Sequence, residues 1–564
     1  MHYEYSAIES LYIFKSLPFF AIVYCIWIGL LLLLVFTLKI KNKGDWEGLA
    51  LSLIFSLVCL GFWTFIAPIR SSDGLNNAIS VQYISTQGQL SANITYGEFP
   101  GLLLLTSVLQ QVTGLNVLAA TGTFVIFNAL FLAVVFYLLM LKFLRNQRFA
   151  AIGVILFFQG NWVLSRMNWF YPGYMGLTLI IIFLILLNRR EGSILNTFGD
   201  MLMAIIISVA ATITHFISSE ILPFVIIGII IIQIANRRKA GSNEITYPDD
   251  AHGISWSILF LSLIIPIIWV LYYASTTFGF LIGYVPTFIH ALTQDQLFTY
   301  ALIVGQSNLG GTVPLWANAT RWFWLVFIYV FGFILALWKL FKVRRLNSVE
   351  RKIVGGLIGI TLFCGVSFLI SPGGEQGQRF LMYLPLCLVP IILGFFINLG
   401  WHIRKYIFGT LAILLFISGL PSFLAYNNTV STDAFYPQDF STGRFVESAY
   451  GDINNLKVFS EGTDTSIATN YEVPNANYYL GASNFTLLKN VNAVWQALDE
   501  LLSTYENSQG QRIFIFSIRT EVPYEHTFGI KPTDPNWQII LETLQDGNEV
   551  YNNNSVQIYQ PATQ

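Results

Sequence analysis

Charged residues are scarce in this sequence: only 11% of its 564 residues are Asp, Glu, Lys or Arg, whereas 55% are hydrophobic. Soluble globular proteins average about 25% charged residues. The scarcity of charged residues excludes a chain that folds as a single large soluble enzyme, and the high apolar content excludes a disordered chain. The formal net charge is only −1, so a basic surface for a nucleic-acid partner is not expected.

The sequence also lacks the motifs by which several enzyme classes bind nucleotides or metals. It contains no Walker-type phosphate loop, no G-x-G-x-x-G after a predicted strand, no G-x-S-x-G and no H-E-x-x-H. A soluble nucleotide-sugar transferase and an ATP-driven pump therefore find no support. The cysteines lie in apolar runs without metal-ligand spacing, so no disulfide framework is expected. They are Cys25, Cys59, Cys364 and Cys387.

Long apolar segments are what the sequence has in abundance. A helix needs about 20 apolar residues to cross the hydrocarbon core of a membrane. Segments of this kind occur up to residue 424 and then stop. They predict twelve membrane spans, at 17–38, 48–68, 117–141, 149–165, 174–188, 199–215, 219–235, 255–274, 321–338, 353–370, 381–399 and 406–424.

Basic residues are distributed unevenly over the loops between these segments. Nineteen of the 24 Lys and Arg residues before position 426 fall in alternate loops. Because basic loops face the cytoplasm, the remaining loops, both termini and the region after residue 425 are predicted to lie outside. That last region carries 6 basic and 16 acidic residues, which is typical of a solvated acidic surface.

Two outer segments and the C-terminal region differ from simple connectors. Residues 69–116 and 275–320 are long, and long loops in compact proteins are usually functional. Residues 426–564 alternate predicted strands and helices, which indicates an α/β domain. We therefore predict an α-helical polytopic membrane domain over residues 1–425 and a soluble extracytoplasmic α/β domain over 426–564. The expected strands are 456–459, 512–518 and 556–559, and the expected helices are 492–505 and 537–545.

Two carboxylates stand out in the first outer loop. Asp73 follows a predicted span in IRSSDGLNN, and Glu98 precedes a Pro-Gly turn in YGEFPGLLLL, which leads into a predicted interfacial helix. Ionisable groups at a membrane boundary are costly and are therefore candidates for function, although each could simply be solvated. Because both lie in one loop, they can converge. Paired carboxylates can share acid–base chemistry or hold a divalent cation through oxygen ligands.

The stretch DGLNNAISVQYISTQGQLSANITYGEFPGLLLL resembles the first outer loop of the GT-C superfamily of membrane glycosyltransferases. It places an acidic residue after a span, then an amphipathic helix, and then an aromatic–acid–Pro segment before a second helix. YGEFPGL in particular is similar to the Tyr-x-Glu-Lys-Pro-Pro-Leu stretch of the lipid A aminoarabinose transferases. The plan of about a dozen spans followed by an outer α/β domain is also GT-C-like, and the chain resembles the type that includes the aminoarabinose transferases and the protein mannosyltransferases.

The resemblance implies an integral-membrane enzyme that moves a sugar from a polyprenyl-phosphate-linked donor to a lipid, glycan or protein acceptor, with inversion. The site would face outward from the plasma membrane of a prokaryote. Asp73 matches the first-loop catalytic acid, and Glu98 matches the later Glu of that loop. Asn77 stands where many relatives have His. A divalent cation, Mg²⁺ or Mn²⁺, would bind at Asp73 if one is used.

Arg379 is the best candidate for a phosphate ligand. It lies in SPGGEQGQRFLMYLP, at the predicted outer mouth of a span, where Glu375 could pair with it. A guanidinium group can contact a phosphate through two N–H groups, and a family arginine near this position binds the phosphate of the lipid donor. The alternative is an interfacial arginine whose charged end reaches water.

Other polar residues at the predicted outer ends of spans are further candidates. His215 and Glu220 lie between two spans in ATITHFISSE, where His215 could act as acid–base group or donor contact, or be a hydrogen-bonded interfacial residue. Arg166 and Tyr171, in SRMNWFYPGY, are expected to line the same cavity. The weakest candidates, both in the second outer segment, are His290 and Asp295.

Two other classes of protein compete with the enzyme. The main alternative is a transporter or flippase of lipid-linked saccharides that carries out no chemistry. Transporters often have internal repeats and broken helices near the middle of the membrane. No repeat is evident here, and the candidate polar residues cluster at the outer loops, which favours the enzyme. A membrane-anchored binding protein is the third class, but twelve spans exceed what an anchor needs.

Overall fold

The computed structural model describes most of residues 97–399 and shorter parts of the rest of the chain. The described ranges, some with gaps of one or two residues, are 48–54, 69–90, 97–159, 170–187, 198–239, 256–283, 323–342, 346–370, 381–399, 434–435, 457–463, 485–488, 512–517, 548–552 and 556–560, together with isolated residues such as 163 and 406.

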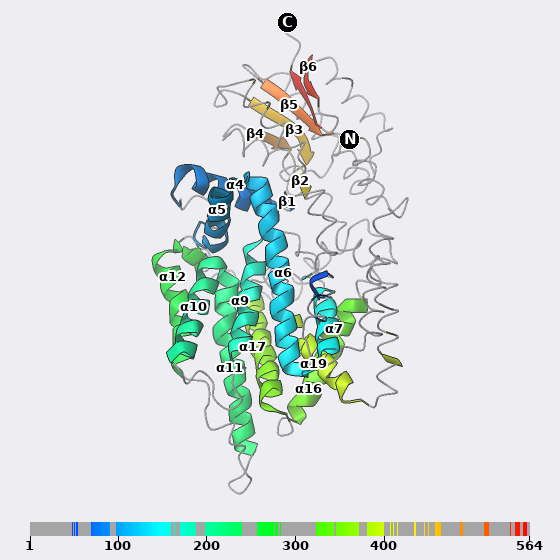
Figure 1. Ribbon diagram of the computed structural model, residues 1–564. Coiled ribbons are helices and arrows are strands. Elements are labelled where there is room, and N and C mark those ends of the chain that lie inside the picture. Colours follow the sequence, from blue (N-terminus) through cyan, green and yellow to red (C-terminus); the bar gives the residue numbers. More distant parts are fainter. Residues whose placement is uncertain are drawn as a thin grey trace, which may run out of the picture.

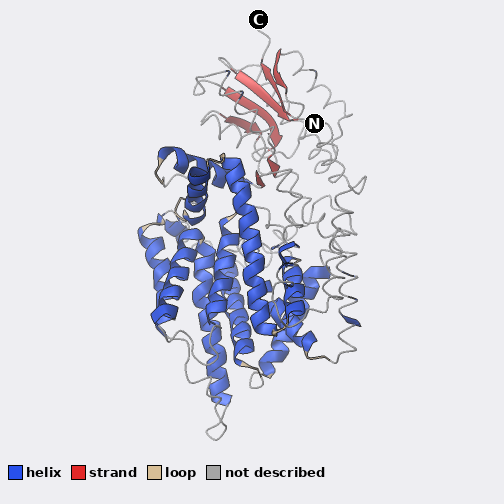
Figure 2. Cartoon of the chain, in the orientation of Figure 1, coloured by secondary structure: helices blue, strands red, loops and turns tan. Residues whose placement is uncertain are grey.

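Apolar helices form a bundle with one continuous hydrophobic core (Figures 1 and 2). Their residues are apolar on nearly all sides, as expected for helices that face either lipid or one another. They are α6 (Val117–Leu144), α7 (Gln147–Phe158), α9 (Pro172–Leu187), α10 (Phe198–Thr214), α11 (Phe216–Lys239), α12 (Trp256–Tyr272), the π-helix η2 (Val326–Phe331), α16 (Gly332–Phe341), α17 (Ser348–Ile370) and α19 (Pro385–Ile397).

The described helices coincide with nine of the predicted apolar segments, from 117–141 to 381–399. Within the described residues, three stretches are long and apolar enough to cross a membrane: Ala119–Leu144, Phe216–Asn236 and Phe323–Phe341. The other apolar helices are shorter. The predicted spans 17–38, 48–68 and 406–424 lie wholly or largely outside the described residues, so the count of twelve stays a prediction.

Asparagine side chains fix the turn between α6 and α7 and the start of α6. Asn116 Oδ1 accepts a hydrogen bond from the backbone N–H of Ala119 (2.8 Å), which caps α6. Asn146 Oδ1 accepts from the N–H groups of Arg148 and Phe149 and so caps α7. Between the helices Arg145 adopts a left-handed conformation with φ 51°. Capping of this kind ends one helix and starts the next without leaving buried N–H groups unpaired.

Glycines let α11 and α17 pack with their backbones in contact. A Cβ atom built on Gly228 would lie 2.1 Å from the carbonyl oxygen of Gly355, and one on Gly359 would lie 2.1 Å from that of Phe224. No larger residue fits at either position without separating the helices. Small residues serve this purpose between membrane helices, where close van der Waals packing drives association.

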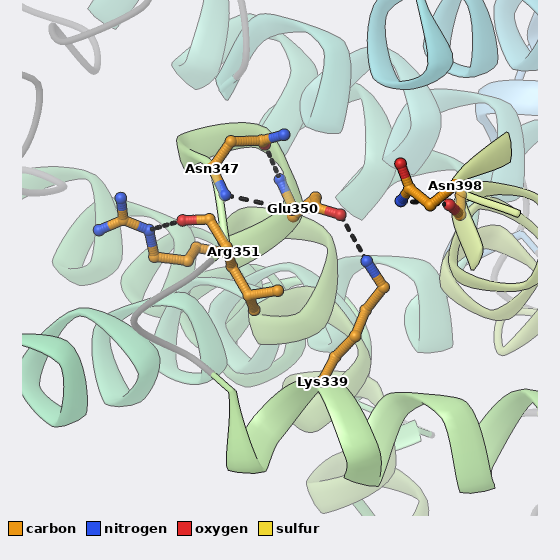
Figure 3. Close-up of polar contacts among 7 residues, drawn as sticks. Lys339, Asn347, Glu350, Arg351 and Asn398 are labelled. Atoms are coloured by element: carbon orange, nitrogen blue, oxygen red, sulfur yellow. Dashed lines mark hydrogen bonds and ion pairs between the residues drawn. The ribbon is translucent and has the colours of Figure 1, made fainter.

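A cluster of polar contacts closes one end of the bundle (Figure 3). Asn347 and Glu350 cap the start of α17 reciprocally: the N–H of Glu350 donates to Asn347 Oδ1 (2.8 Å), and the N–H of Asn347 donates to Glu350 Oε2 (3.1 Å). Glu350 also pairs with Lys339 at the end of α16. Lys352 Nζ donates to the carbonyl oxygen of Leu187 at the end of α9 (2.9 Å). This is the end that the basic loops predict to be cytoplasmic.

The first outer loop folds into two packed helices, α4 (Ser72–Gln87) and α5 (Gly101–Thr113), beside the start of α6 (Figure 1). Polar side chains join them. Ser85 Oγ donates to Gln110 Oε1 (2.8 Å) and lies 2.9 Å from Ser107 Oγ, and Gln110 Nε2 donates to Gln82 Oε1 (3.2 Å). The predicted helix after the Pro-Gly turn is thus confirmed.

Strands connect this loop with the C-terminal region. β1 (Ile69–Arg70) pairs antiparallel with β2 (Ala434–Phe435) just before α4. A five-stranded sheet of order β4-β3-β5-β7-β6 lies at the same end as α4 and α5 (Figure 1). In it β3 is parallel to β4 and β5, whereas β7 is antiparallel to β5 and β6. The strands are β3 (Lys457–Thr463), β4 (Phe485–Leu488), β5 (Arg512–Ser517), β6 (Asn548–Asn552) and β7 (Val556–Gln560).

The sheet confirms the three strands predicted near 456–459, 512–518 and 556–559. The two predicted helices of this region, 492–505 and 537–545, fall outside the described residues except for single positions. The domain boundary at residue 425 stays a prediction.

Candidate functional site

The candidate residues that the structure describes lie at the end of the bundle opposite the Lys339–Glu350 pair, near α4 and α5. At this end α10 and α12 finish and α9, α11 and α19 begin. The Pro-Gly turn before α5 rests directly on the end of α10, because a Cβ atom on Gly101 would lie 2.7 Å from Thr214 Oγ1. The rings of Phe99 and Phe216 pack with their centroids 6.0 Å apart. Gly101, the second glycine of the YGEFPGL motif, therefore lets the turn lie this close to the end of α10.

Glu98 fastens the first outer loop to the start of the second outer segment. Its carboxylate oxygen Oε2 accepts hydrogen bonds from the backbone N–H (2.9 Å) and the hydroxyl (2.5 Å) of Thr277. Its carbonyl oxygen accepts from Trp269 Nε1 of α12 (2.8 Å). Glu98 is half-buried, and hydrogen bonds to an ionised acceptor are about twice as strong as neutral ones. The two outer segments, which the sequence predicts separately, meet at this carboxylate.

Four buried polar side chains form a network that crosses the same end of the bundle. Tyr171 Oη lies 3.1 Å from His215 Nε2, and His215 Nδ1 lies 3.1 Å from Ser218 Oγ. Ser218 Oγ lies 2.8 Å from Tyr383 Oη. All four residues are at least 95% buried. We call these residues, Tyr171, His215, Ser218 and Tyr383, the buried network.

Asn77 links helix α4 to the buried network. Its Nδ2 donates to the carbonyl oxygen of Phe170 (3.0 Å), the residue before Tyr171. Asn77 is fully buried, and its Oδ1 has no hydrogen-bond partner among the described residues. Asp73 lies four residues earlier in α4, about one helical turn away, so it shares a helix face with Asn77. The side chain of Asp73 is outside what the structure describes.

The remaining candidates are placed only in part. Glu220 lies in the first turn and a half of α11 and is half-buried. Arg166, Arg379, Glu375, His290 and Asp295 fall outside the described residues. Tyr383 follows Arg379 by four residues and belongs to a turn, residues 381–384, that leads into α19. The structure thus brings together Asn77, Tyr171, His215 and Glu98 from four separate stretches of sequence.

Sequence reasoning missed Ser218, Tyr383 and Thr277. Ser218 lies three residues after His215, which immediately precedes α11. Residues three apart lie on one face of a helix, so a helical projection of this segment could have found Ser218. Tyr383 is 165 residues away from Ser218. No local pattern in the sequence could have joined Tyr383 or Thr277 to the site.

Among the described residues, no three His, Cys, Asp or Glu side chains lie close enough together to hold a metal ion. The expected ligand for Mg²⁺ or Mn²⁺, the carboxylate of Asp73, is outside the described side chains. No step of the proposed reaction is therefore assigned to a metal ion.

The chain resembles several solved structures of membrane glycosyltransferases. ArnT from Cupriavidus metallidurans bound to undecaprenyl phosphate is 11% identical, with a TM-score of 0.49 over 92% of this chain and 99% of that one. The oligosaccharyltransferase AglB from Archaeoglobus fulgidus, in complex with an inhibitory peptide and a dolichol-phosphate, is 11% identical, with a TM-score of 0.49 over 93% and 75%. The arabinofuranosyltransferase AftD from mycobacteria is 11% identical, with a TM-score of 0.42 over 93% and 42%.

These three proteins are GT-C glycosyltransferases, the superfamily that the first outer loop resembles in sequence. No family model matches the chain, and no curated protein matches it. TM-scores below 0.5 do not assign the chain to a family.

Proposed function

We propose that this protein is a membrane glycosyltransferase that moves a sugar from a polyprenyl-phosphate-linked donor to an acceptor at the outer face of a membrane. One observation carries the proposal: polar side chains converge at the end of the bundle that the basic loops predict to be external. They include the anchored carboxylate of Glu98 and the buried network, with α4 and its Asp73 beside them. Intramembrane polar residues are costly and usually serve function.

The residues suggest how the reaction would proceed. Asp73 takes the proton of an acceptor hydroxyl, whose oxygen attacks the anomeric carbon of the donor sugar. The bond from that carbon to the phosphate oxygen breaks, and polyprenyl phosphate leaves with both bonding electrons. Arg379 stabilises the charge that develops on the phosphate. A single displacement of this kind inverts the anomeric carbon.

Glu98 has a supporting role in this proposal. Its described contacts hold the second outer segment against the first, so it shapes the entrance above the buried network. Residues 426–564 would cover the site from outside, because their strand β2 pairs with β1 immediately before α4. The protein would reside in the plasma membrane of a prokaryote, with this domain extracytoplasmic, and the acceptor would be a lipid, a glycan or a protein.

The test is a reconstitution. Purified protein in lipid vesicles is given defined polyprenyl-phosphate sugars and cell-envelope acceptors, and the glycosylated product and the released polyprenyl phosphate are both quantified. We expect the two products in equal amounts. Movement of the lipid-linked saccharide across the bilayer without release of polyprenyl phosphate would contradict the proposal and identify a transporter.

A further inference from the structure

The buried network joins parts of the molecule that are far apart in sequence. Tyr171 precedes α9, His215 lies between α10 and α11, Ser218 lies in the first turn of α11, and Tyr383 belongs to the turn before α19. At one end, the carbonyl oxygen of Phe170 holds Asn77 of α4 (3.0 Å). Through three side-chain hydrogen bonds the network therefore connects α4 with residues 381–384.

A residue of another helix fixes the end of the buried network that contains Tyr383. Tyr329 Oη donates to the carbonyl oxygen of Leu381 (2.9 Å), which fixes the turn that contains Tyr383. Tyr329 lies in the π-helix η2, and π-helical turns of this kind occur frequently at functional sites. The extra residue in such a turn changes the direction in which the following side chains point.

Glycines in α9 provide the space that the network needs. A Cβ atom on Gly176 would lie 1.9 Å from Ser218 Oγ, and one on Gly173 would lie 2.3 Å from Cε1 of Tyr171. Glycine has a lower helix propensity than alanine, so two glycines near the start of an apolar helix are unfavourable for the helix itself. Here they admit a hydroxyl and a phenol ring into the core.

We propose that the buried network is a positioning network for the transfer site, with Ser218 as its central residue. It sets the turn of residues 381–384, which follows Arg379, against helix α4, which carries Asp73 and Asn77. This inference rests on the proposed function. Ser218 and Tyr383 are positioning residues: they act through the backbone segments that they hold.

Ser218 orders the network because its hydroxyl carries one proton. In the neutral imidazole one ring nitrogen donates and the other accepts. Ser218 can donate to His215 Nδ1 and accept from Tyr383, donate to Tyr383 and accept from His215, or accept from both. In each arrangement Ser218 Oγ bonds to both neighbours, so removal of the hydroxyl leaves two buried polar atoms without this partner. A shift of about 1 Å in a positioned group can reduce a rate about 100-fold.

Ser218→Ala tests the proposal, with Ser219→Ala as its matched control. Ser219 is the next residue in α11 and is equally buried, but its Oγ donates to the carbonyl oxygen of Phe216 in its own helix (2.6 Å). In reconstituted vesicles we expect Ser218→Ala to lower kcat about 10- to 100-fold while the KM for the polyprenyl-phosphate donor changes less than about threefold. Ser219→Ala should retain the wild-type kcat.

Tyr383→Phe is the second variant, because it removes the hydroxyl that bonds to Ser218 and keeps the ring. If Ser218→Ala does not fold, Tyr383→Phe should still show the same loss of kcat. Equal kcat in wild type, Ser218→Ala and Tyr383→Phe would overturn the positioning role. A loss of the same size in Ser219→Ala would also overturn it, since the effect would then reflect any buried hydroxyl in α11.

Nuclear magnetic resonance tests the hydrogen bonds of the buried network without a transferase assay. The chain has six histidines, so ¹⁵N-histidine labelling of the full-length protein in lipid gives few signals, and the His215→Gln variant assigns those of His215. We expect the ring nitrogen shifts of His215 to change in Ser218→Ala and to stay fixed in Ser219→Ala. Unchanged shifts in Ser218→Ala would contradict the network. Wild-type protein without transferase activity would instead contradict the proposed function.

Discussion

Single residues at the end of the bundle beside α4 and α5 act mainly by holding segments of chain together. Glu98 receives two hydrogen bonds from Thr277, and His215 lies between Tyr171 and Ser218. Each of these groups would be costly in an apolar environment if it were unpaired. The residues that a sequence marks as reactive can therefore have an architectural task as well.

The anchor at Glu98 can be tested through Thr277. Replacing Thr277 with Val removes the hydroxyl donor but keeps the shape of the side chain and the backbone N–H. A hydrogen bond to a charged group contributes about 1.5–3 kcal/mol to stability. Because Glu98 is only half-buried, we expect the free energy of unfolding to fall by about 1.5 kcal/mol. Thermal unfolding in detergent measures it.

Thr277→Ser retains the hydroxyl and is the control, so it should unfold close to the wild-type temperature. If Thr277→Val and Thr277→Ser unfold at the same temperature, the side-chain bond to Glu98 does not hold the two outer segments together.

The residue scale also shows how far the site could be predicted. The sequence predicts Tyr171 and His215 as neighbours because both lie at the predicted outer ends of spans, and the structure brings them within hydrogen-bonding distance. Ser218 carries no charge and is common in helices, so composition does not mark it. The catalytic roles of Asp73, Glu98 and Arg379 stay predictions.

At the scale of elements, the length of an apolar run predicts a helix well because a segment without polar side chains must satisfy its backbone internally. Nine predicted segments coincide with described helices on this basis. The short strand β1 is not predicted by the sequence, because it depends on β2, which is distant in sequence. The π-helical turn in η2 is not predicted either. The close approach of α11 and α17 is likewise a property of two helices together.

Glycines in α17 provide a test of that close approach. Gly359→Ala places a methyl group against the backbone of Phe224, so the helices must separate, and we expect a loss of about 1–3 kcal/mol. Gly365 is in the same helix, and a Cβ atom there meets nothing within 4 Å. Gly365→Ala should leave stability unchanged or raise it by up to about 1 kcal/mol through helix propensity.

Unfolding temperatures of the two alanine variants, measured in the same detergent, make the comparison. A Gly359→Ala variant as stable as Gly365→Ala would show that α11 and α17 do not touch at this point.

At the scale of the whole molecule, charge and polarity are sorted to opposite ends of the helices. Lys339 and Glu350 close one end (Figure 3), where Lys352 also bonds to the end of α9. At the other end lie α4, α5 and the five-stranded sheet (Figure 1), and the helix ends there carry the buried network. The near-zero net charge of the sequence conceals this separation. Sorting the basic residues by loop predicted which end to search for function, and the candidate residues that the structure describes do gather there.

The orientation can be measured by cysteine labelling. Asn552→Cys in β6 and Lys342→Cys after α16 place exposed thiols at the two ends. In intact cells a membrane-impermeant maleimide should label Asn552→Cys, and it should label Lys342→Cys only after the membrane is permeabilised. The wild type, whose cysteines lie in apolar segments, is the control. Labelling of Lys342→Cys in intact cells would reverse the proposed topology.

The rate of sugar transfer by Asp73→Asn, relative to the wild type, tests the central claim most directly. Asp200→Asn, the same substitution near the start of α10 at the opposite end of the bundle, is the matched control. Because general acid–base catalysis contributes about 10²- to 10⁴-fold, we predict a loss of that size in Asp73→Asn and none in Asp200→Asn. Transfer by Asp73→Asn at the wild-type rate would contradict the proposed role of Asp73 and the location of the active site beside α4.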